Sequence, residues 1–189
     1  MIWRWYEERR LRLLASSVHG KVLDIGYAEW PNRHFPPGAE VTGVDHIEAP
    51  KPPGYARQVV GDFHGHLDLE PESFDFVIAG EVIEHIEDPY RFLRQAMTML
   101  KPGGELRLST PNPVSFPVVA FEWARSTRFF FAADHRHYMT PRWVVKMLGD
   151  VGFVDIETRP VGLWMPGVPL PWAPVGLSYQ VLYLARRPS

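Results

Sequence analysis

The stretch FDFVIAGEVIEHIEDPYRFLRQAMTMLKPGGELRLSTPNP, from Phe74 to Pro113, decides the fold of this chain. Phe74 to Ala79 is a short apolar run typical of a buried strand. Pro89 to Leu100 then carries apolar residues at the spacing of one helix face, and Lys101-Pro102-Gly103-Gly104 stops that helix. Glu105 to Ser109 is a second strand. A strand, a helix and a strand in this order predict two neighbouring parallel strands of an α/β sheet.

Strand and helix signals of the same kind lie on both sides of this stretch. Further strands are expected at Val22 to Ile25, Val41 to Val44, Gln58 to Val60, Phe153 to Pro160 and Tyr179 to Arg186. Residues 1–19 have the charge and apolar pattern of an amphipathic helix. Thr140-Pro141 is a helix start, with threonine as N-cap and proline at the first helical position, and this helix should reach about Val151. Residues 1–189 are therefore expected to form a single domain.

The links after the first two strands are unusual. Tyr27 to Glu40 contains Pro31, Pro36 and Pro37, and three further prolines lie between His46 and Tyr55. A parallel crossover normally needs a dozen or more residues with a helix among them. We expect the first crossover helices to be shortened or missing.

Composition excludes several classes of function. The 189 residues are 46% hydrophobic and 22% charged, which is ordinary for a globular domain. A formal net charge of -2 gives no basic surface for nucleic acid. The chain has no cysteine, so disulfides, thiolate catalysis and cysteine-ligated metals are excluded.

The location of the protein is predicted from two segments. The N-terminal residues are too charged for the apolar core of a signal peptide. Val161 to Ala185 carries no charge and is long enough to span a bilayer, but its prolines and glycines would break a membrane helix. We therefore expect a cytoplasmic protein with no spanning segment.

Acidic residues and glycines follow four of the predicted strands. They are Asp24 with Gly26, Asp45, Gly61-Asp62, and Gly80-Glu81. In a parallel sheet, ligands bind beyond the carboxyl ends of the strands. A carboxylate after the second strand can accept hydrogen bonds from ribose hydroxyls, and one after the third can accept from the adenine amine. One such acid alone indicates a solvated loop or helix cap, whereas four in order indicate a nucleoside site.

The sequence resembles the class I S-adenosylmethionine-dependent methyltransferases, in the small single-domain group that includes ubiquinone-biosynthesis-type methyltransferases. The matching text is VLDIG, VTGVDH, VVGDFH, the long stretch quoted above and HRHYMTPRWVVKMLGDVGF. The resemblance implies a Rossmann-like, seven-stranded, mostly parallel sheet whose last strand is antiparallel. It also implies S-adenosylmethionine as the cofactor.

The resemblance further implies which residues bind the cofactor. By position these are Asp24, Gly26 and Tyr27 at the methionine end, Asp45 and His46 at the ribose, Asp62 and Phe63 at the adenine, and Gly80 and Glu81 beside the sulfonium.

The loop after the first strand departs from the family pattern. The family usually has Gly-Cys-Gly-x-Gly, and this chain has Gly26-Tyr27-Ala28-Glu29-Trp30. Glycines there adopt positive φ and let the backbone approach the cofactor, so Ala28 is tolerated only with a negative φ and Trp30 must turn away. A lost helix also removes positive dipole from the site. We predict a degenerate loop with weakened cofactor binding, completed by groups such as Arg33 or the opening helix.

Catalytic residues are predicted within the motif EVIEHIED. If this stretch is helical, Glu81, Glu84 and His85 share one face and could bind a divalent ion or act as acid and base. Some ubiquinone-type O-methyltransferases use the corresponding residues for metal, so the resemblance implies a metal as a possibility. The alternative is that His85 packs beside the cofactor while Glu84 caps a helix or forms an ion pair. The prediction is no bound metal, with His85 as the proton carrier and Glu84 as the second catalytic residue.

The acceptor side is predicted from two insertions, residues 114–139 and 161–178. Both are rich in Phe and Trp, which suits a small or apolar acceptor, a dimer face, contact with a membrane surface or a local core. His135 and His137 lie in the first insertion and are expected on the surface. The predicted function is methyl transfer to an oxygen or nitrogen of a small or lipid-like acceptor. The alternative is a catalytically silent binding or scaffold protein, and the oligomeric state stays open.

Overall fold

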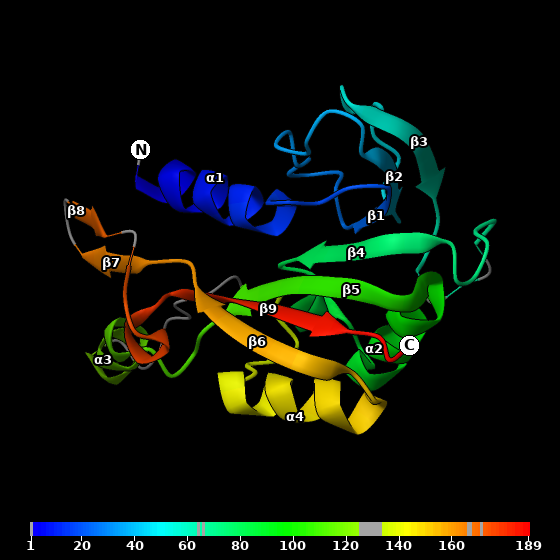
Figure 1. The fold of residues 1–189 in the computed structure, drawn as a ribbon. Coiled ribbons are helices and arrows are strands. Elements are labelled where there is room, and N and C mark those ends of the chain that lie inside the picture. The colour runs from blue at the N-terminus through cyan, green and yellow to red at the C-terminus, as the bar shows by residue number, and fades with distance from the viewer. Residues whose placement is uncertain (1, 64, 66, 125–133, 166–167, 171) are drawn as a thin grey trace.

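The computed structural model describes residues 2–63, 65, 67–124, 134–165, 168–170 and 172–189. Its main sheet has seven strands in the order β3-β2-β1-β4-β5-β9-β6 (Figure 1). The strands are β1 Lys21–Ile25, β2 Glu40–Asp45, β3 Tyr55–Val60, β4 Phe74–Gly80, β5 Leu100–Pro111, β6 Val154–Pro160 and β9 Gln180–Arg186. The pairs among β3, β2, β1, β4 and β5 are parallel, and β9 is antiparallel to both its neighbours. The predicted sheet is confirmed, including its antiparallel last strand.

Helices cover both faces of this sheet. The opening helix α1, Ile2–Ala15, lies over one face, and α2, Pro89–Met99, and α4, Pro141–Val151, lie under the other (Figure 1). Local signals set the starts of α2 and α4. Asp88 caps α2 by accepting a hydrogen bond from the Arg91 N–H, and Thr140 caps α4 by accepting from the Trp143 N–H. The larger core lies on the α2 and α4 side, where these helices bury apolar side chains against β4 and β5.

The first two crossovers contain no helix, as the prolines predict. Residues 26–39 and 46–54 are irregular. Tyr27 fills part of the space beside β2, and its ring would lie 2.7 Å from a Cβ built on Gly43. Tyr55 from β3 packs against Tyr27 and Phe35, so a small aromatic core stands where a helix would lie.

The two insertions form elements of their own. Residues 114–139 contain α3, Phe116–Ala124, whereas 125–133 lie outside the described residues. Residues 161–178 contain a hairpin that the sequence did not predict, made of β7, Leu163–Met165, and β8, Val168–Leu170, followed by a short 3-10 turn η2, Val175–Leu177. Helix α1 holds this region in place, because the Tyr6 hydroxyl donates to the Leu163 carbonyl and Arg9 Nε donates to the Val161 carbonyl at 2.6 Å.

Exposed aromatic side chains lie on the two insertions. Phe116 and Trp123 on α3 and Trp172 beside the hairpin are all largely exposed. Over the part of the chain that the structure describes, none of the helices has the length and apolar character needed to cross a membrane.

Candidate functional site

The carboxyl ends of β1, β2 and β4 meet at one edge of the sheet. Asp24 is paired in register with Gly43 of β2 on one side and with Ile78 of β4 on the other. Three of the acids expected at the cofactor, Asp24, Asp45 and Glu81, follow or end these neighbouring strands. The sheet therefore gathers them as the sequence predicts.

Gly26 begins the loop that departs from the family pattern. Its φ is +76°, and a Cβ at this position would lie 2.5 Å from Val82 Cγ2, so glycine is required both by conformation and by the close approach of Val82. Ala28 is absent from the described residues with positive φ, and Trp30 is largely exposed. The loop thus turns Trp30 away from the strand ends.

A cavity of about 150 Å³ lies between α1 and this loop. Its lining residues are Arg4, Glu7, Glu8, Leu11, Glu29, Trp30, Pro31 and Arg33. A larger hollow of about 410 Å³ lies over the charged sheet face formed by β5, β6 and β9, and its lining includes none of the residues predicted to bind cofactor.

Asp24 is buried beneath the rebuilt loop. The Tyr55 hydroxyl donates a hydrogen bond to its carboxylate and itself accepts from the Asn32 N–H at 3.1 Å. Burial raises the pKa of Asp24 to about 7, although Tyr55 and Arg10 act to lower it. Asp24 therefore fastens β1 to β3 as well as standing at the predicted methionine end.

Asp45 holds the same loop from the end of β2. Its Oδ2 accepts from the Ala28 N–H at 2.8 Å, and its Oδ1 accepts from the Ile47 N–H at 3.0 Å. His46 projects into solvent, with Nδ1 3.2 Å from Asp45 Oδ1. The carboxylate predicted to bind the ribose is thus in place, but its oxygens already accept backbone hydrogen bonds.

Asp62 and Phe63 follow β3 as predicted. Asp62 is exposed, and its carbonyl accepts from the Gly65 N–H at 2.8 Å. Phe63 is buried, and its ring centroid lies 5.2 Å from that of Phe92. The side chain of Phe63 belongs to the core, which leaves its backbone as the group able to face an adenine.

Glu81 is held by three elements at the end of β4. Its φ is +59°, its Oε1 accepts from the Ser109 hydroxyl at 2.9 Å, and its Oε2 accepts from Gln180 Nε2 at 3.0 Å. Burial raises the pKa of Glu81, and the nearby Arg10 guanidinium lowers it. Arg10 is buried and forms an ion pair with Glu7, which accepts a hydrogen bond from Gln180.

Arg10 also explains why residue 80 is glycine. A Cβ on Gly80 would lie 2.3 Å from Arg10 Nη1 and 2.8 Å from Leu14 Cδ1. Helix α1 therefore packs directly on the end of β4 and brings a buried cation among the strand-end acids. The opening helix was expected to help complete the site, but Arg10 was not among the predicted residues.

The expected helical face of Glu81, Glu84 and His85 is not formed. Only Ile83–His85 makes a 3-10 turn, η1, and the positive φ of Glu81 places that residue outside it. Glu81 pairs with Ser109 and Gln180 instead, so the predicted three-residue set is corrected.

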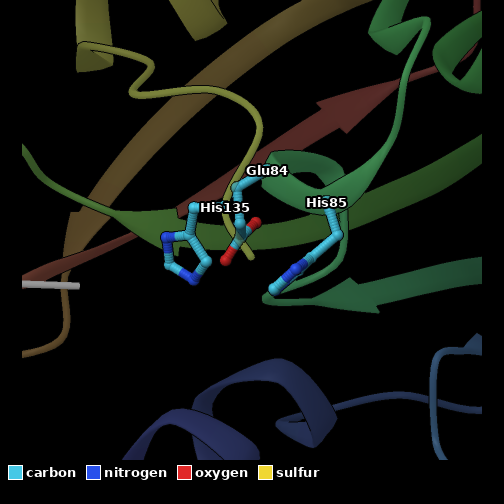
Figure 2. Close-up of side chains that lie close together, drawn as sticks. All are labelled: Glu84, His85 and His135. Carbon is cyan, nitrogen blue, oxygen red and sulfur yellow. The ribbon is translucent and has the colours of Figure 1, made fainter. Parts of the chain in front are cut away.

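His135 takes the position beside Glu84 and His85 (Figure 2). One ligand atom from each of the three side chains lies within 4.8 Å of the others, and Figure 2 shows the Glu84 carboxylate close to both imidazole rings. The ring centroids of His85 and His135 are 4.7 Å apart with planes at 88°. His85 Nδ1 also lies 3.2 Å from a carboxylate oxygen of Asp134.

Backbone hydrogen bonds bring His135 to this position. The N–H groups of Arg136 and His137 donate to the Glu84 carbonyl at 2.9 and 3.1 Å, which fastens the loop before α4 to η1. His135 is half-buried, and its place beside Glu84 and His85 is a grouping that the sequence did not predict. His137 is half-buried, and its Nε2 has no hydrogen-bond partner among the described residues.

Glu84 is buried in an unusual state. Only 1% of the residue is exposed, and neither carboxylate oxygen has a partner at ordinary hydrogen-bond geometry among the described residues, although an interaction with the Thr110 side chain acts to lower the pKa of Glu84. Burial, followed by the charge of Glu81, raises the pKa of Glu84 well above its usual value. Burial and then the nearby His85 lower the pKa of His135, against the charge of Asp134, which raises it.

Comparison with known proteins identifies the family. The sequence matches the profile described as a methyltransferase domain over residues 4–158, which is most of the chain. The chain belongs to this methyltransferase family. S-Adenosylmethionine is the cofactor of the family, and the chain is an S-adenosylmethionine-dependent methyltransferase.

Two curated relatives illustrate the sequence similarity. The chain is 28% identical to the ubiquinone biosynthesis O-methyltransferase of Aliivibrio fischeri over 74% of the chain and 68% of the relative. It is 33% identical to the protein of the same name from Pseudomonas syringae pv. tomato over 63% of the chain and 56% of the relative. The chain thus spans between about half and two thirds of the length of these relatives.

Solved structures show the same fold. A methyltransferase of Thermotoga maritima described as a possible histamine N-methyltransferase superposes with a TM-score of 0.76 at 18% identity, covering 98% of this chain and 94% of that one. Phosphoethanolamine N-methyltransferase 2 of Haemonchus contortus, solved with S-adenosyl-L-methionine, has a TM-score of 0.64 at 16% identity, covering 98% of this chain and 53% of that one. At these identities the likeness concerns the fold alone.

The methyltransferase site has two regions with different chemistry. Asp24, Asp45 and Glu81 with Gly26 and Gly80 lie at the strand ends where the sequence predicts the cofactor. Glu84, His85 and His135 form a second region, which holds two imidazoles able to take a proton and one carboxylate that lacks a donor.

Proposed function

We propose that this methyltransferase transfers the methyl group of S-adenosylmethionine to an oxygen or nitrogen of a small or lipid-like acceptor. The observation that carries the proposal is that the acids at the strand ends lie next to the group of Glu84, His85 and His135. A cofactor edge with three acids lies directly beside Glu84 and His85. The names of the curated relatives, ubiquinone biosynthesis O-methyltransferases, support a small-molecule acceptor.

The cofactor residues are proposed by position. Asp24, Gly26 and Tyr27 stand at the methionine end, Asp45 and His46 at the ribose, Asp62 and Phe63 at the adenine, and Gly80 and Glu81 at the sulfonium. The positive φ of Gly26 and the buried carboxylates of Asp45 and Glu81 support this assignment.

Cofactor binding is proposed to be weak because side chains of the protein already pack against the two glycines of the predicted cofactor site. Val82 touches Gly26, and Arg10 with Leu14 lies on Gly80. Asp45 Oδ2 already accepts from the Ala28 N–H, so a ribose hydroxyl has only the remaining lone pair of that oxygen. Part of the binding free energy is therefore spent on moving the loop and α1.

The reaction is a displacement at the methyl carbon. A lone pair of the acceptor forms the new bond to carbon while the carbon–sulfur bond breaks and its electron pair returns to sulfur. His85 takes the proton that the acceptor loses. Its Nδ1 lies beside Asp134, so Nε2 is the ring nitrogen left to take that proton. Glu84, next to His85, is the second proposed catalytic residue.

A labelled-methyl assay tests the proposal. Purified protein is incubated with S-adenosylmethionine that carries a tritiated methyl group and with a panel of phenols, amines and quinol lipids. We expect label in at least one acceptor, and a loss of about a hundredfold in turnover for His85→Ala. His19→Ala is the matched control, because His19 is exposed at the far end of α1 and contacts Phe76. Full turnover by His85→Ala would contradict its role.

The catalytically silent alternative is not favoured by the relatives. The rebuilt loop and missing crossover helices would suit it. The buried Glu84, however, is costly to the folded state unless a ligand uses it. Absence of any labelled product with a folded, cofactor-binding protein would restore this alternative.

A further inference from the structure

Gln180 has a buried side-chain amide whose two ends differ in their partners. The residue begins β9 and is paired in register with Pro111, so it lies at the edge of the sheet where β5 ends. Only 2% of it is exposed. Its Nε2 donates to Glu7 Oε1 at 3.2 Å and to Glu81 Oε2 at 3.0 Å. Its Oε1 has no hydrogen-bond partner among the described residues.

The orientation of this amide follows from its neighbours. An amide nitrogen has two hydrogens to donate, whereas a carboxylate only accepts, so the nitrogen faces Glu7 and Glu81. The ion pair of Glu7 with Arg10 keeps that acid an acceptor. Turning the amide over would place its carbonyl oxygen against acid oxygens on both sides. The amide oxygen is therefore directed away from these two acids.

The donors close to Gln180 are already in use. The Ser109 hydroxyl donates to Glu81 Oε1, and the Arg10 guanidinium donates to Glu7 Oε2. A buried carbonyl oxygen is nearly always paired, because leaving it without a donor is unfavourable to the folded state. Gln180 Oε1 is thus an acceptor that a bound molecule can satisfy.

The cofactor has one group of donors that no side chain has yet been assigned to hold. S-Adenosylmethionine can donate from its adenine amine, its ribose hydroxyls and its α-ammonium group. The first two have proposed partners in Asp62 and Asp45. Asp24, the acid at the proposed methionine end, is buried beneath the loop and already accepts from the Tyr55 hydroxyl. The ammonium group therefore still needs a side-chain acceptor.

Gln180 lies where that group would be. Glu81, which Gln180 holds, stands at the proposed sulfonium position, and a short chain of three carbon atoms joins the sulfur to the ammonium nitrogen. Glu7, the other partner of Gln180, lines the cavity of about 150 Å³ between α1 and the rebuilt loop. Gln180 thus joins the proposed sulfonium end to the space beneath α1.

We propose that Gln180 binds the α-ammonium group of S-adenosylmethionine through its Oε1 and is a specificity-determining residue for the cofactor. This inference rests on the proposed cofactor positions and adds to them a residue of β9. The same side chain holds Glu7 of α1 and Glu81 at the end of β4 through its nitrogen. Recognition of the ammonium group is thereby coupled to the packing of α1 on the site.

Two ligands that differ only in the ammonium group test the proposal without requiring turnover. S-Adenosylhomocysteine and its deaminated analogue, which has hydrogen in place of the α-ammonium group and keeps the carboxylate, are titrated calorimetrically against the full chain. The wild type should bind S-adenosylhomocysteine about tenfold to a hundredfold more tightly, since a hydrogen bond from a charged donor is lost in the analogue. Gln180→Met keeps the size of the side chain without its amide and should lower this ratio about tenfold.

Two further variants serve as controls. Gln180→Glu keeps an acceptor oxygen at the same place along the side chain, so it should preserve the preference for S-adenosylhomocysteine. Gln95→Met makes the same change on α2, beneath the opposite face of the sheet from α1 (Figure 1), and should bind both ligands like the wild type. Thermal unfolding without ligand checks that each variant folds, and the comparison of the two ligands on the wild type depends on no variant.

Several outcomes would overturn the inference. Equal wild-type affinity for the two ligands would do so and leave the proposed cofactor site standing. An unchanged ratio in folded Gln180→Met would show that Oε1 is satisfied by water. Equal weakening of both ligands in that variant would show a purely structural role. Binding of neither ligand to the folded wild type would overturn the proposed cofactor site and this inference with it.

Discussion

The Tyr55 hydroxyl donates a hydrogen bond to the buried Asp24 carboxylate, which joins β3 to β1 beneath the rebuilt loop. In this position Tyr55 and Tyr27 replace a crossover helix with an aromatic core. The consequence is that an acid of the cofactor edge is also part of the packing that supports it.

This contact makes stability depend on pH. Burial raises the pKa of Asp24 to about 7 in the folded protein, whereas it is about 3.9 in the unfolded chain. The folded state therefore binds more protons between these values, and the contribution of Asp24 to stability is present below about pH 4 and lost as pH rises through about 7. The loss is at most about 4 kcal/mol. In Asp24→Asn, urea unfolding from pH 4 to 8 should show a flatter profile; a slope equal to that of the wild type would contradict the assignment.

Gly26 is expected to resist substitution for two separable reasons. Gly26→Ala should destabilise the protein by about 1 to 3 kcal/mol, because φ is +76° and the new Cβ meets Val82. The double variant Gly26→Ala/Val82→Ala removes the contact with Val82 but keeps the unfavourable φ. It should therefore lose less stability than the sum of the two single variants, which a double-mutant cycle detects as a coupling free energy. Denaturant unfolding measures all four proteins. Strict additivity would argue against the Val82 contact.

Arg10 should stabilise the acids around it. Arg10→Met is expected to cost about 3 kcal/mol or more, since it leaves buried Glu81 without its nearby cation. Arg12→Met is the control, as Arg12 is exposed on the same helix. Equal stability of the two variants in chemical denaturation would refute this role.

Asp134 is expected to position His85. Asp134→Asn should lower kcat about threefold to tenfold and leave the KM for S-adenosylmethionine unchanged, because the ion pair is 72% exposed on the Asp134 side and only orients the ring. Steady-state kinetics measures kcat and KM separately, and an altered KM with unchanged kcat would contradict the assignment.

Removal of divalent metal should leave turnover unchanged. Glu81 is bound to Ser109 and Gln180 and does not join Glu84 and His85, and the group of Glu84, His85 and His135 that could hold an ion is assigned here to proton transfer. Activity after dialysis against a chelator, with and without added magnesium, manganese or zinc, measures this. A loss that one metal restores would show that the chain needs an ion.

The fold was predictable because its signals are local or repeat along the chain. Asp88-Pro89 and Thr140-Pro141 start α2 and α4 where the sequence predicts. The prolines between β1 and β3 predict missing helices. The acids at the strand ends follow from the parallel order of the strands.

The parts of the site that were missed depend on contacts between distant residues. Arg10 reaches Glu81 only after α1 packs on Gly80. His135 reaches Glu84 through backbone hydrogen bonds from Arg136 and His137, for which the sequence carries no side-chain signal. The positive φ of Glu81 breaks the helical face that spacing alone predicts.

The most direct test of the account is calorimetric titration of the full chain with S-adenosylhomocysteine. The account predicts saturable heat at one ligand per chain with weak affinity, about 10 to 100 μM, because α1 and the Gly26 loop must move. No heat at millimolar ligand with a folded protein would contradict the claim that the rebuilt loop still admits the cofactor.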